Sequence, residues 1–119
     1  MHIHHLALRV RDFEKSLHFY QTLTELKIHT QFSANGGSIA YLQNASGETQ
    51  LELIGMPEGE TVKVSGMFLC FGTEDIASAH ERAVLHDMNP SDIRQPEPDA
   101  RYFYVYDPDG LSVQVREYR

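Results

Sequence analysis

Four residues, two in each half of the chain and separated by nearly the same number of positions, differ in the chemistry that they could support. His5 and Glu52 lie in the first half of the sequence, and Phe68 and Gln114 follow them at distances of 63 and 62 positions. A neutral imidazole and a carboxylate are good ligands for Zn, Ni, Mn or Fe(II), whereas an amide oxygen is a weaker ligand and a phenyl ring binds no metal. These residue types therefore supply half of a metal site.

A repeated pattern accounts for this spacing. Residues 5–13 read HLALRVRDF and residues 68–76 read FLCFGTEDI, and both stretches alternate before an Asp that can open a helix. Leu51-Glu52-Leu53 and Val113-Gln114-Val115 form a second matched pair. A unit of about 60 residues is too short to close a core alone and must pack against its copy. The functional site is therefore expected where the two copies meet.

The first copy is expected to contain a strand, a helix and three further strands. Asp12 can serve as the N-cap of the helix, and Asn35-Gly36-Gly37 is a turn signal between the two strands of a hairpin. The expected elements are a strand over residues 3–10, a helix over 13–23, and strands over 27–32, 38–42 and 49–54.

The second copy follows the same plan after a linker that contains Pro57 and Gly59. Asp75 can cap the helix, and Asn89-Pro90 ends that segment. The expected strands are residues 67–73, 91–95, 101–106 and 111–115, with a loop at 96–99. The prediction is one α+β domain over residues 1–119, with repeat one at about 1–55, a linker at 56–65 and repeat two at about 66–119.

Composition and charge restrict the partners. The chain has 119 residues, of which 41% are hydrophobic and 23% are charged, as in ordinary globular proteins. Its formal charge of −7 argues against binding to nucleic acid or anionic lipid. The apolar runs are too short to cross a bilayer and the N-terminus does not read as a signal peptide, so we expect a cytoplasmic protein. Cys70 is the only cysteine, which agrees with a reducing compartment.

Two stretches carry a resemblance to a known family. His5-Leu6-Ala7-Leu8-Arg9-Val10-Arg11-Asp12 leads into Ser16-Leu17-His18-Phe19-Tyr20, and Tyr104-Val105-Tyr106-Asp107-Pro108-Asp109-Gly110 stands near the end. Together with the paired βαβββ plan, they make the chain similar to the vicinal oxygen chelate superfamily of glyoxalases, bleomycin-resistance proteins and extradiol dioxygenases. The resemblance implies a curved mixed sheet around a cup-shaped cleft, with the helices on the outer face.

The same resemblance implies roles for the four matched residues. In metal-dependent members a divalent ion is held from equivalent strands of the two copies, and the match carries the ligand role onto His5 and Glu52. Phe68 stands where those enzymes have a His, and Gln114 stands where they have a Glu, although some glyoxalases use a Gln. The metal set is then His5, Glu52 and Gln114 at most, so a divalent metal (Zn, Ni, Mn or Fe) is expected to be absent or weakly bound.

Two functions remain open at this point. One is a homodimeric protein that binds a small organic ligand in the cleft without chemistry. The other is a divalent-metal-dependent lyase or isomerase, in which Glu52 or a bound water moves a proton. If no metal is present, Glu52 must be paired with Arg9, Arg116 or His5, because a buried carboxylate needs a partner.

Five residues are candidates for ligand contact. Phe68 and Cys70 share a strand face, and Cys70 is either a nucleophile or inert buried packing. Tyr104 can stack on a ligand or donate to it, or it can be part of a hydroxyl-rich wall. Arg9 and Arg116 can clamp a carboxylate or phosphate, or they can be solvated strand-end residues. The remaining histidines are expected at the surface.

Overall fold

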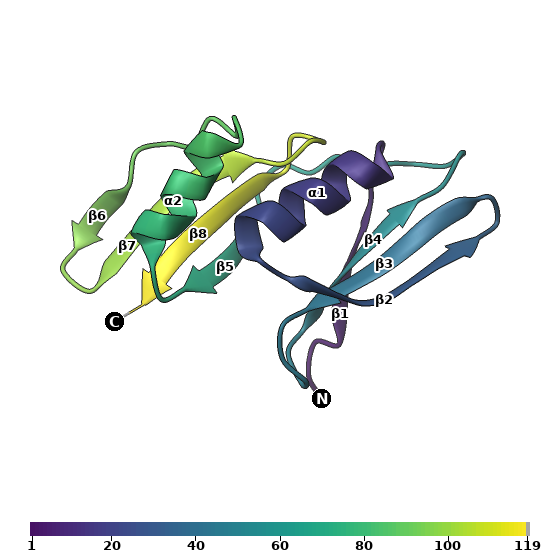
Figure 1. Cartoon of the computed structure of the whole chain (residues 1–119), viewed down its shortest axis with the longest axis horizontal. Helices are drawn as coiled ribbons and strands as arrows, with labels where there is room; N and C mark the ends of the chain where they lie inside the picture. The colour runs from purple at the N-terminus through teal and green to yellow at the C-terminus, as the bar shows by residue number, and fades with distance from the viewer. Residues whose placement is uncertain (119) are drawn as a thin grey trace. The chain divides into compact units, whose positions relative to one another are not determined.

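The computed structural model describes residues 1–118, the last of them by its backbone alone, and divides the chain into two compact units, Met1–Lys63 and Val64–Arg119. The boundary falls inside the stretch that was expected to link the repeats. Unit 1 contains β1 (His5–Arg9), α1 (Phe13–Thr24), β2 (Lys27–Ala34), β3 (Gly37–Gln43) and β4 (Gln50–Gly55). Unit 2 contains β5 (Leu69–Thr73), α2 (Ile76–Leu85), β6 (Arg94–Glu97), β7 (Ala100–Tyr106) and β8 (Ser112–Tyr118) (Figure 1).

Each unit has one four-stranded mixed sheet, and the strand order is the same in both. The first sheet runs β1-β4-β3-β2 and the second runs β5-β8-β7-β6. In each sheet the first pair is parallel and the remaining pairs are antiparallel. A parallel pair needs a long connection, which the helix and the two middle strands of each unit supply. The predicted α+β fold with two βαβββ repeats is therefore confirmed.

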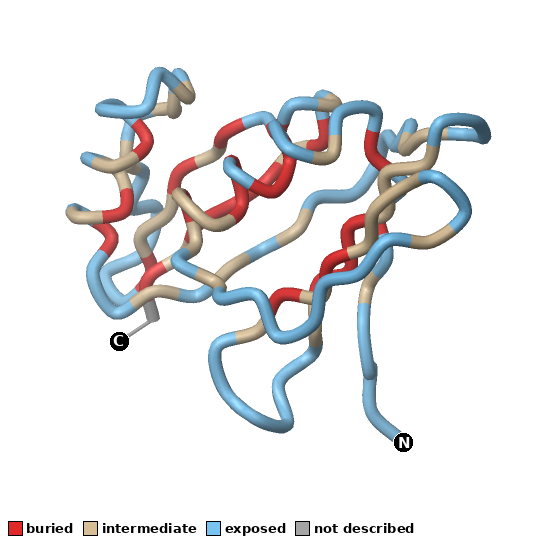
Figure 2. The backbone as a smooth tube through the Cα atoms, turned by 45° about the vertical axis from the view of Figure 1, so that its right-hand side comes forward, coloured by how far each residue is buried: buried red, intermediate tan, exposed pale blue. Residues whose placement is uncertain are grey.

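In unit 1 the helix covers one face of its sheet. Asp12 caps α1 as predicted, because its side chain accepts a hydrogen bond of 3.1 Å from the Lys15 N–H. Glu25 ends the helix in the left-handed conformation, with φ of 60°. Buried residues lie along α1 and on the strands, as the colours of Figure 2 show, and their apolar side chains make up the core of this unit. This core includes Leu17, Tyr20, Leu23, Leu42, Leu51 and Leu53.

Unit 2 repeats this arrangement with a different helix. Asp75 caps α2, and hydrogen bonds from the Ser78 hydroxyl (2.7 Å) and N–H (3.1 Å) lower the pKa of its carboxyl. The helix buries Ile76, Ala79 and Ala83 and contacts β7 and β8. The strands contribute the buried side chains Phe103, Val105, Val113 and Val115.

A part-buried ion pair within the sheet of unit 2 also reaches the start of the helix. The Glu117 carboxylate accepts hydrogen bonds from the Ile76 N–H at 2.9 Å and from Arg101 Nη2 at 2.8 Å and 3.1 Å. It therefore satisfies one of the free amides at the start of α2 as well as a guanidinium. In unit 1 the corresponding residue is Gly55, where an added Cβ would lie 2.6 Å from Cβ of Phe13. The contact between the last strand and the start of the helix is therefore made by a carboxylate in unit 2 and by close backbone packing in unit 1.

Some element boundaries differ from those predicted. The expected strand over residues 91–95 and loop over 96–99 were wrong, because β6 spans Arg94–Glu97 and includes Pro96. A proline fits there because β6 is an edge strand, with an irregular register between Arg94 and Glu97. Strands β1 and β5 are shorter than predicted, so Phe68 lies immediately before β5. Over the described part of the chain, neither helix has the length and apolar character needed to span a bilayer.

Replacing Glu117 by Ala should destabilise the protein by about 3 kcal/mol, because it leaves the Arg101 guanidinium and the Ile76 amide without their acceptor. Chemical denaturation of the purified variant measures this change. Glu97→Ala is the matched control, since Glu97 is exposed on β6, and its effect should stay within about 0.5 kcal/mol. Equal losses for the two variants would contradict the role given to Glu117.

Candidate functional site

The candidate residues lie on the face of each sheet that is turned away from its helix, which we call the distal face. The strand register pairs Ala7 with Glu52 and Glu52 with Tyr41 in unit 1. It pairs Cys70 with Gln114 and Gln114 with Tyr104 in unit 2. Paired residues on neighbouring strands project to the same face. Each distal face therefore presents a row of side chains that can interact.

Three residues of unit 1 form what we call the first triad: His5, Tyr41 and Glu52. Nε2 of His5 lies 3.4 Å from Oε1 of Glu52, and the Tyr41 hydroxyl donates a hydrogen bond to the same carboxylate. The His5 and Tyr41 rings meet edge to face, with 5.7 Å between centroids. Glu52 is 7% exposed, so its charge needs these partners.

The Glu52 carboxylate changes the acidity of its neighbour. The hydrogen bond to Glu52 raises the pKa of the Tyr41 hydroxyl, and burial and the negative charge of Glu52 act in the same direction. Tyr41 is therefore a neutral hydrogen-bond donor throughout the physiological pH range. It holds one side of a carboxylate whose other side faces an imidazole.

The equivalent residues of unit 2 form the second triad: Phe68, Tyr104 and Gln114. Nε2 of Gln114 donates to the Tyr104 hydroxyl oxygen at 2.8 Å, and the Phe68 and Tyr104 rings meet edge to face at 5.5 Å between centroids. The Cys70 thiol donates to Oε1 of Gln114 at 3.1 Å. Gln114 is 4% exposed, and both ends of its amide have a partner.

Tyr41 is a site residue that the sequence interpretation missed. It precedes Tyr104 by 63 positions, the same offset that separates His5 from Phe68. In both units the tyrosine hydrogen-bonds the residue on the last strand and contacts the ring of the residue that begins or directly precedes the first strand. Applying the repeat offset to Tyr104 would have found it.

The donor atoms present do not fit the metal site that the resemblance implies. Nδ1 of His5 lies 2.8 Å from Nδ1 of His4, so both ring nitrogens of His5 are engaged. The carbonyl oxygen of Gln114 already accepts from Cys70, and Phe68 has no donor atom. Within residues 1–118 no group of three His, Cys, Asp or Glu side chains gathers as a metal site would require.

The sequence left open which cation pairs with Glu52, and the structure gives His5 together with Tyr41. Arg116 instead lies over the Tyr102 ring, with its Cζ 5.6 Å from the centroid. The rings of Tyr102 and Tyr104 are 5.7 Å apart. Arg116 therefore extends an aromatic row on the distal face of unit 2.

Two further predictions about side-chain environment need correction. Cys70 is exposed, so its interpretation as buried packing was wrong. His80 was expected at the surface but is half buried, because its Nε2 hydrogen-bonds the Ser91 carbonyl oxygen at 2.9 Å and its ring packs on Phe103.

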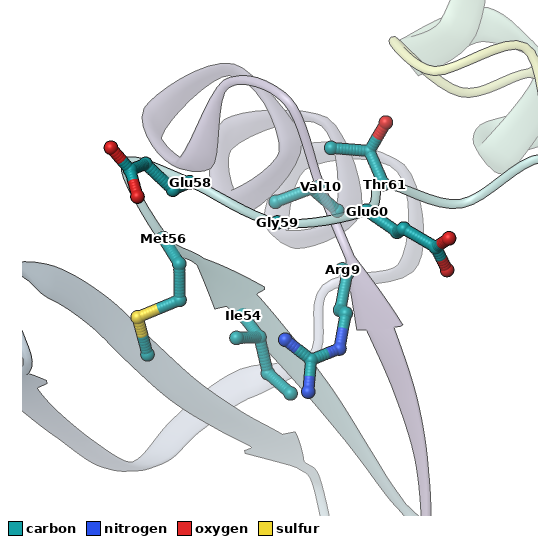
Figure 3. Close-up of a pocket in the computed structure, with 8 residues that line it drawn as sticks. All are labelled: Arg9, Val10, Ile54, Met56, Glu58, Gly59, Glu60 and Thr61. Atoms are coloured by element: carbon teal, nitrogen blue, oxygen red, sulfur yellow. The ribbon is translucent and has the colours of Figure 1, made fainter.

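Arg9 lies at one end of the unit 1 distal face, beside a hollow of about 470 Å³. The residues that line it come from β1, β3, β4 and the segments next to them: Arg9, Asn35, Ile39, Ile54, Met56, Pro57 and Glu58. A smaller groove of about 10 Å³ adjoins it near Arg9 and Glu60 (Figure 3). The hollow has the volume of a small-molecule site.

The sequence matches the model of a family described as the Glyoxalase/Bleomycin resistance protein/Dioxygenase superfamily over residues 2–115. No curated protein matches the sequence significantly. Solved structures share the fold. The antibiotic binding protein TnmS3 from Streptomyces sp. CB03234 has a TM-score of 0.80 at 19% identity, covering 100% of this chain and 97% of that one.

Two further structures show the same fold. The trypanothione-dependent glyoxalase I of Leishmania major has a TM-score of 0.78 at 20% identity, covering 97% of this chain and 85% of that one. A mutant of the fosfomycin resistance protein FosX from Listeria monocytogenes, complexed with Mn(II) and 1S,2S-dihydroxypropylphosphonic acid, has a TM-score of 0.74 at 15% identity, covering 96% and 90%.

Replacing Glu52 by Gln should return the pKa of Tyr41 toward its ordinary value, because the replacement removes the charge and weakens the hydrogen bond that raise it. NMR titration of ¹³Cζ-labelled tyrosine measures the change, and Tyr41→Phe assigns the signal. The raised pKa of Tyr41 also makes the stability of the protein depend on pH. Tyr41 contributes stability below the pKa of an unfolded tyrosine, and this contribution is lost as pH rises through the folded pKa.

Glu58→Gln is the control for this titration, since it removes a carboxylate from the same unit at an exposed position. It should leave the Tyr41 titration in place. A Tyr41 pKa that does not respond to Glu52→Gln would show that the hydrogen bond is absent in solution.

Proposed function

The chain belongs to the Glyoxalase/Bleomycin resistance protein/Dioxygenase superfamily, and from that premise we propose that it binds a small organic ligand and performs no chemistry on it. The two triads, each on the distal face of its own unit, supply polar and aromatic groups for such a ligand. We further propose that the active form is a cytoplasmic homodimer. Light scattering coupled to size-exclusion chromatography tests the oligomeric state.

One observation carries the proposal: the second triad is complete without any ion. A phenyl ring and an amide stand where the resemblance implies two metal ligands, and the amide is satisfied by Tyr104 and Cys70. Neither group carries a charge that a cation would have to balance. The second triad is therefore suited to contact with an uncharged part of a ligand.

The aromatic rings in and beside the second triad support an organic ligand. Phe68 is 46% exposed, and its ring, together with Tyr102 and Tyr104, forms an aromatic surface with Arg116 over one end. Exposed aromatic groups of this kind often mark binding surfaces. A flat, unsaturated ligand can pack against these rings while its polar atoms reach Gln114 or the Tyr104 hydroxyl.

A second function is favoured by the first triad. His5 and Glu52 are 3.4 Å apart on neighbouring strands, and this pair would suit a divalent-metal-dependent lyase or isomerase of the glyoxalase or epimerase type. Glu52 would then be the residue that moves a proton. The likeness to an antibiotic binding protein and to a glyoxalase I is one of fold, so it supports both functions equally.

Elemental analysis of the purified, untagged protein separates the two proposals. Because His2, His4 and His5 adjoin at the N-terminus, the measurement needs a His2→Ala/His4→Ala variant in parallel, which removes adventitious binding there. Substoichiometric metal in this variant supports the binding protein. Stoichiometric Zn, Ni, Mn or Fe, with turnover of a hemithioacetal that His5→Ala abolishes, would overturn it in favour of the enzyme.

Replacing Phe68 by Ala should weaken a ligand found by thermal-shift screening by about five- to tenfold, because it removes an exposed ring from the proposed contact surface. Titration calorimetry measures the affinity. Val84→Ala is the matched control, since Val84 is an exposed apolar residue of α2, away from the distal face. If the two variants bind the ligand as tightly as each other, the aromatic surface is not the site.

Replacing Phe68 by His should raise the affinity for Zn or Ni by about tenfold or more, because an imidazole then stands at a position to which the resemblance assigns a metal ligand. Competition with a chromophoric chelator in the His2→Ala/His4→Ala background measures this gain. Tyr106→His places an imidazole on another exposed ring of the same distal face and should give no comparable gain. An unchanged affinity for Phe68→His would contradict the ligand role that the resemblance assigns to this position.

A further inference from the structure

The hollow at the end of the unit 1 distal face combines an apolar floor with one cation. Ile39, Ile54, Met56 and Pro57 supply apolar atoms, and Arg9 supplies the guanidinium. The register aligns Arg9 with Ile54 and Ile54 with Ile39 across three adjacent strands, so these side chains lie in one row. A ligand in this hollow would meet hydrocarbon along its body and positive charge at one end.

The walls of the hollow are formed by backbone that has little freedom. Asn35 and Gly36 have φ of 50° and 77°, as in the tight hairpin turns that match the twist of the strands. An added Cβ at Gly37 would lie 2.2 Å from the Gly55 carbonyl oxygen and 2.7 Å from Sδ of Met56. The absence of a side chain at Gly37 therefore lets the turn approach the segment after β4, and the hollow is preformed.

The Arg9 backbone is fixed while its side chain is available. Its carbonyl oxygen accepts a hydrogen bond of 2.7 Å from the Val62 N–H, and the next residue, Val10, donates to the Ile54 carbonyl oxygen at 2.9 Å. Among the described residues, no hydrogen bond or ion pair engages the Arg9 guanidinium. Figure 3 shows the guanidinium beside Ile54, whereas the Glu58 and Glu60 carboxylates point away from it.

The charge distribution on the distal face adds a second argument. The chain carries −7 overall, yet the strand positions of the unit 1 distal face place Lys27 and Arg9 against a single carboxylate, Glu52. That carboxylate is already held by His5 and Tyr41. The Arg9 guanidinium thus lies next to apolar groups with no hydrogen-bonded carboxylate from the described part of the chain, while Glu58 stands on the rim of the same hollow. An anion in direct contact with this guanidinium would be held strongly.

The second repeat keeps an arginine in the same row. The position equivalent to Arg9 is Gly72, and the position equivalent to Ile54 is Arg116. The arginine of unit 2 therefore lies on the last strand, whereas that of unit 1 lies on the first. Arg116 lies over Tyr102, which occupies the place of Ile39. An arginine next to an apolar or aromatic side chain is therefore present in this row of both repeats.

From these observations we propose that the unit 1 hollow binds an amphipathic monocarboxylate, with the carboxylate on the Arg9 guanidinium and the hydrocarbon against Ile39, Ile54 and Met56. This inference rests on the proposed function, since it names the class of ligand that the unit 1 distal face takes. Guanidinium binds carboxylate through two parallel hydrogen bonds, which fixes the orientation of the ligand. Glu58 lines the rim and disfavours a second negative group there.

Titration of the full chain with octanoate tests the proposal, with octan-1-ol as the uncharged probe of equal length. Octanoate should bind more tightly than octan-1-ol, and NMR shifts should appear at the methyl groups of Ile39, Ile54 and Met56. Arg9→Met should weaken octanoate by about tenfold or more and leave octan-1-ol unchanged, because only the charged contact is lost. Arg9→Lys should restore part of the loss, since it keeps the charge without the paired hydrogen bonds.

Lys15→Met is the matched control, because it removes the same charge from an exposed position of α1 in the same unit. It should leave octanoate affinity unchanged. Equal binding of octanoate and octan-1-ol, or equal effects of Arg9→Met and Lys15→Met, would overturn the inference and leave the proposed function standing. Failure of both probes also overturns it, and the proposed function is then judged by the ligand screen and the metal analysis alone.

Discussion

The register of the two parallel strand pairs is the constraint on which the candidate site depends. Pairing β1 with β4 places Ala7 opposite Glu52, and pairing β5 with β8 places Cys70 opposite Gln114. Because side chains alternate along a strand, a slip of one residue would turn Glu52 toward the helix and bury it among leucines. The leucines on either side of Glu52 prevent such a slip, since they would then have to face away from the core.

With this register, equivalent side chains of the two repeats have the same geometry but different chemistry. In both units a tyrosine hydrogen-bonds the residue on the last strand and meets the ring of the residue that begins or directly precedes the first strand. Unit 1 fills these places with an imidazole and an acid, and unit 2 fills them with a phenyl ring and an amide. The acid requires partners because it is buried and charged, whereas the amide is satisfied by neutral groups. One scaffold thus supports a polar half-site and an aromatic one.

Much of the fold could be predicted from the sequence because its signals are local. The alternation of apolar residues, the caps Asp12 and Asp75 and the hairpin turn at Asn35 each act over a few residues, and the repeat offset shows that the plan occurs twice. The bounds of the edge strand β6 could not be predicted in this way. A proline such as Pro96 argues against an interior strand but is tolerated in an edge strand, and the sequence does not show which strand lies at the edge.

The site was harder to predict because its partners are chosen by contacts between strands. The sequence allowed three cations to pair with Glu52, and only the register and the side-chain directions select His5 and Tyr41. Tyr41 was not predicted because its phenol is not among the side chains expected to bind the metal. The contact between His4 and His5 depends on backbone that precedes β1, where a strand was predicted from residue 3 but does not form.

The central claim is that the distal-face side chains hydrogen-bond one another and do not bind a metal ion. The Gln114 side-chain amide reports on this most directly, since its Nε2 donates to Tyr104 at 2.8 Å. NMR of this amide during addition of Zn to the His2→Ala/His4→Ala variant should show slow hydrogen exchange and no shift at one equivalent. A stoichiometric shift of the Gln114 amide, accompanied by loss of its protection, would contradict the account.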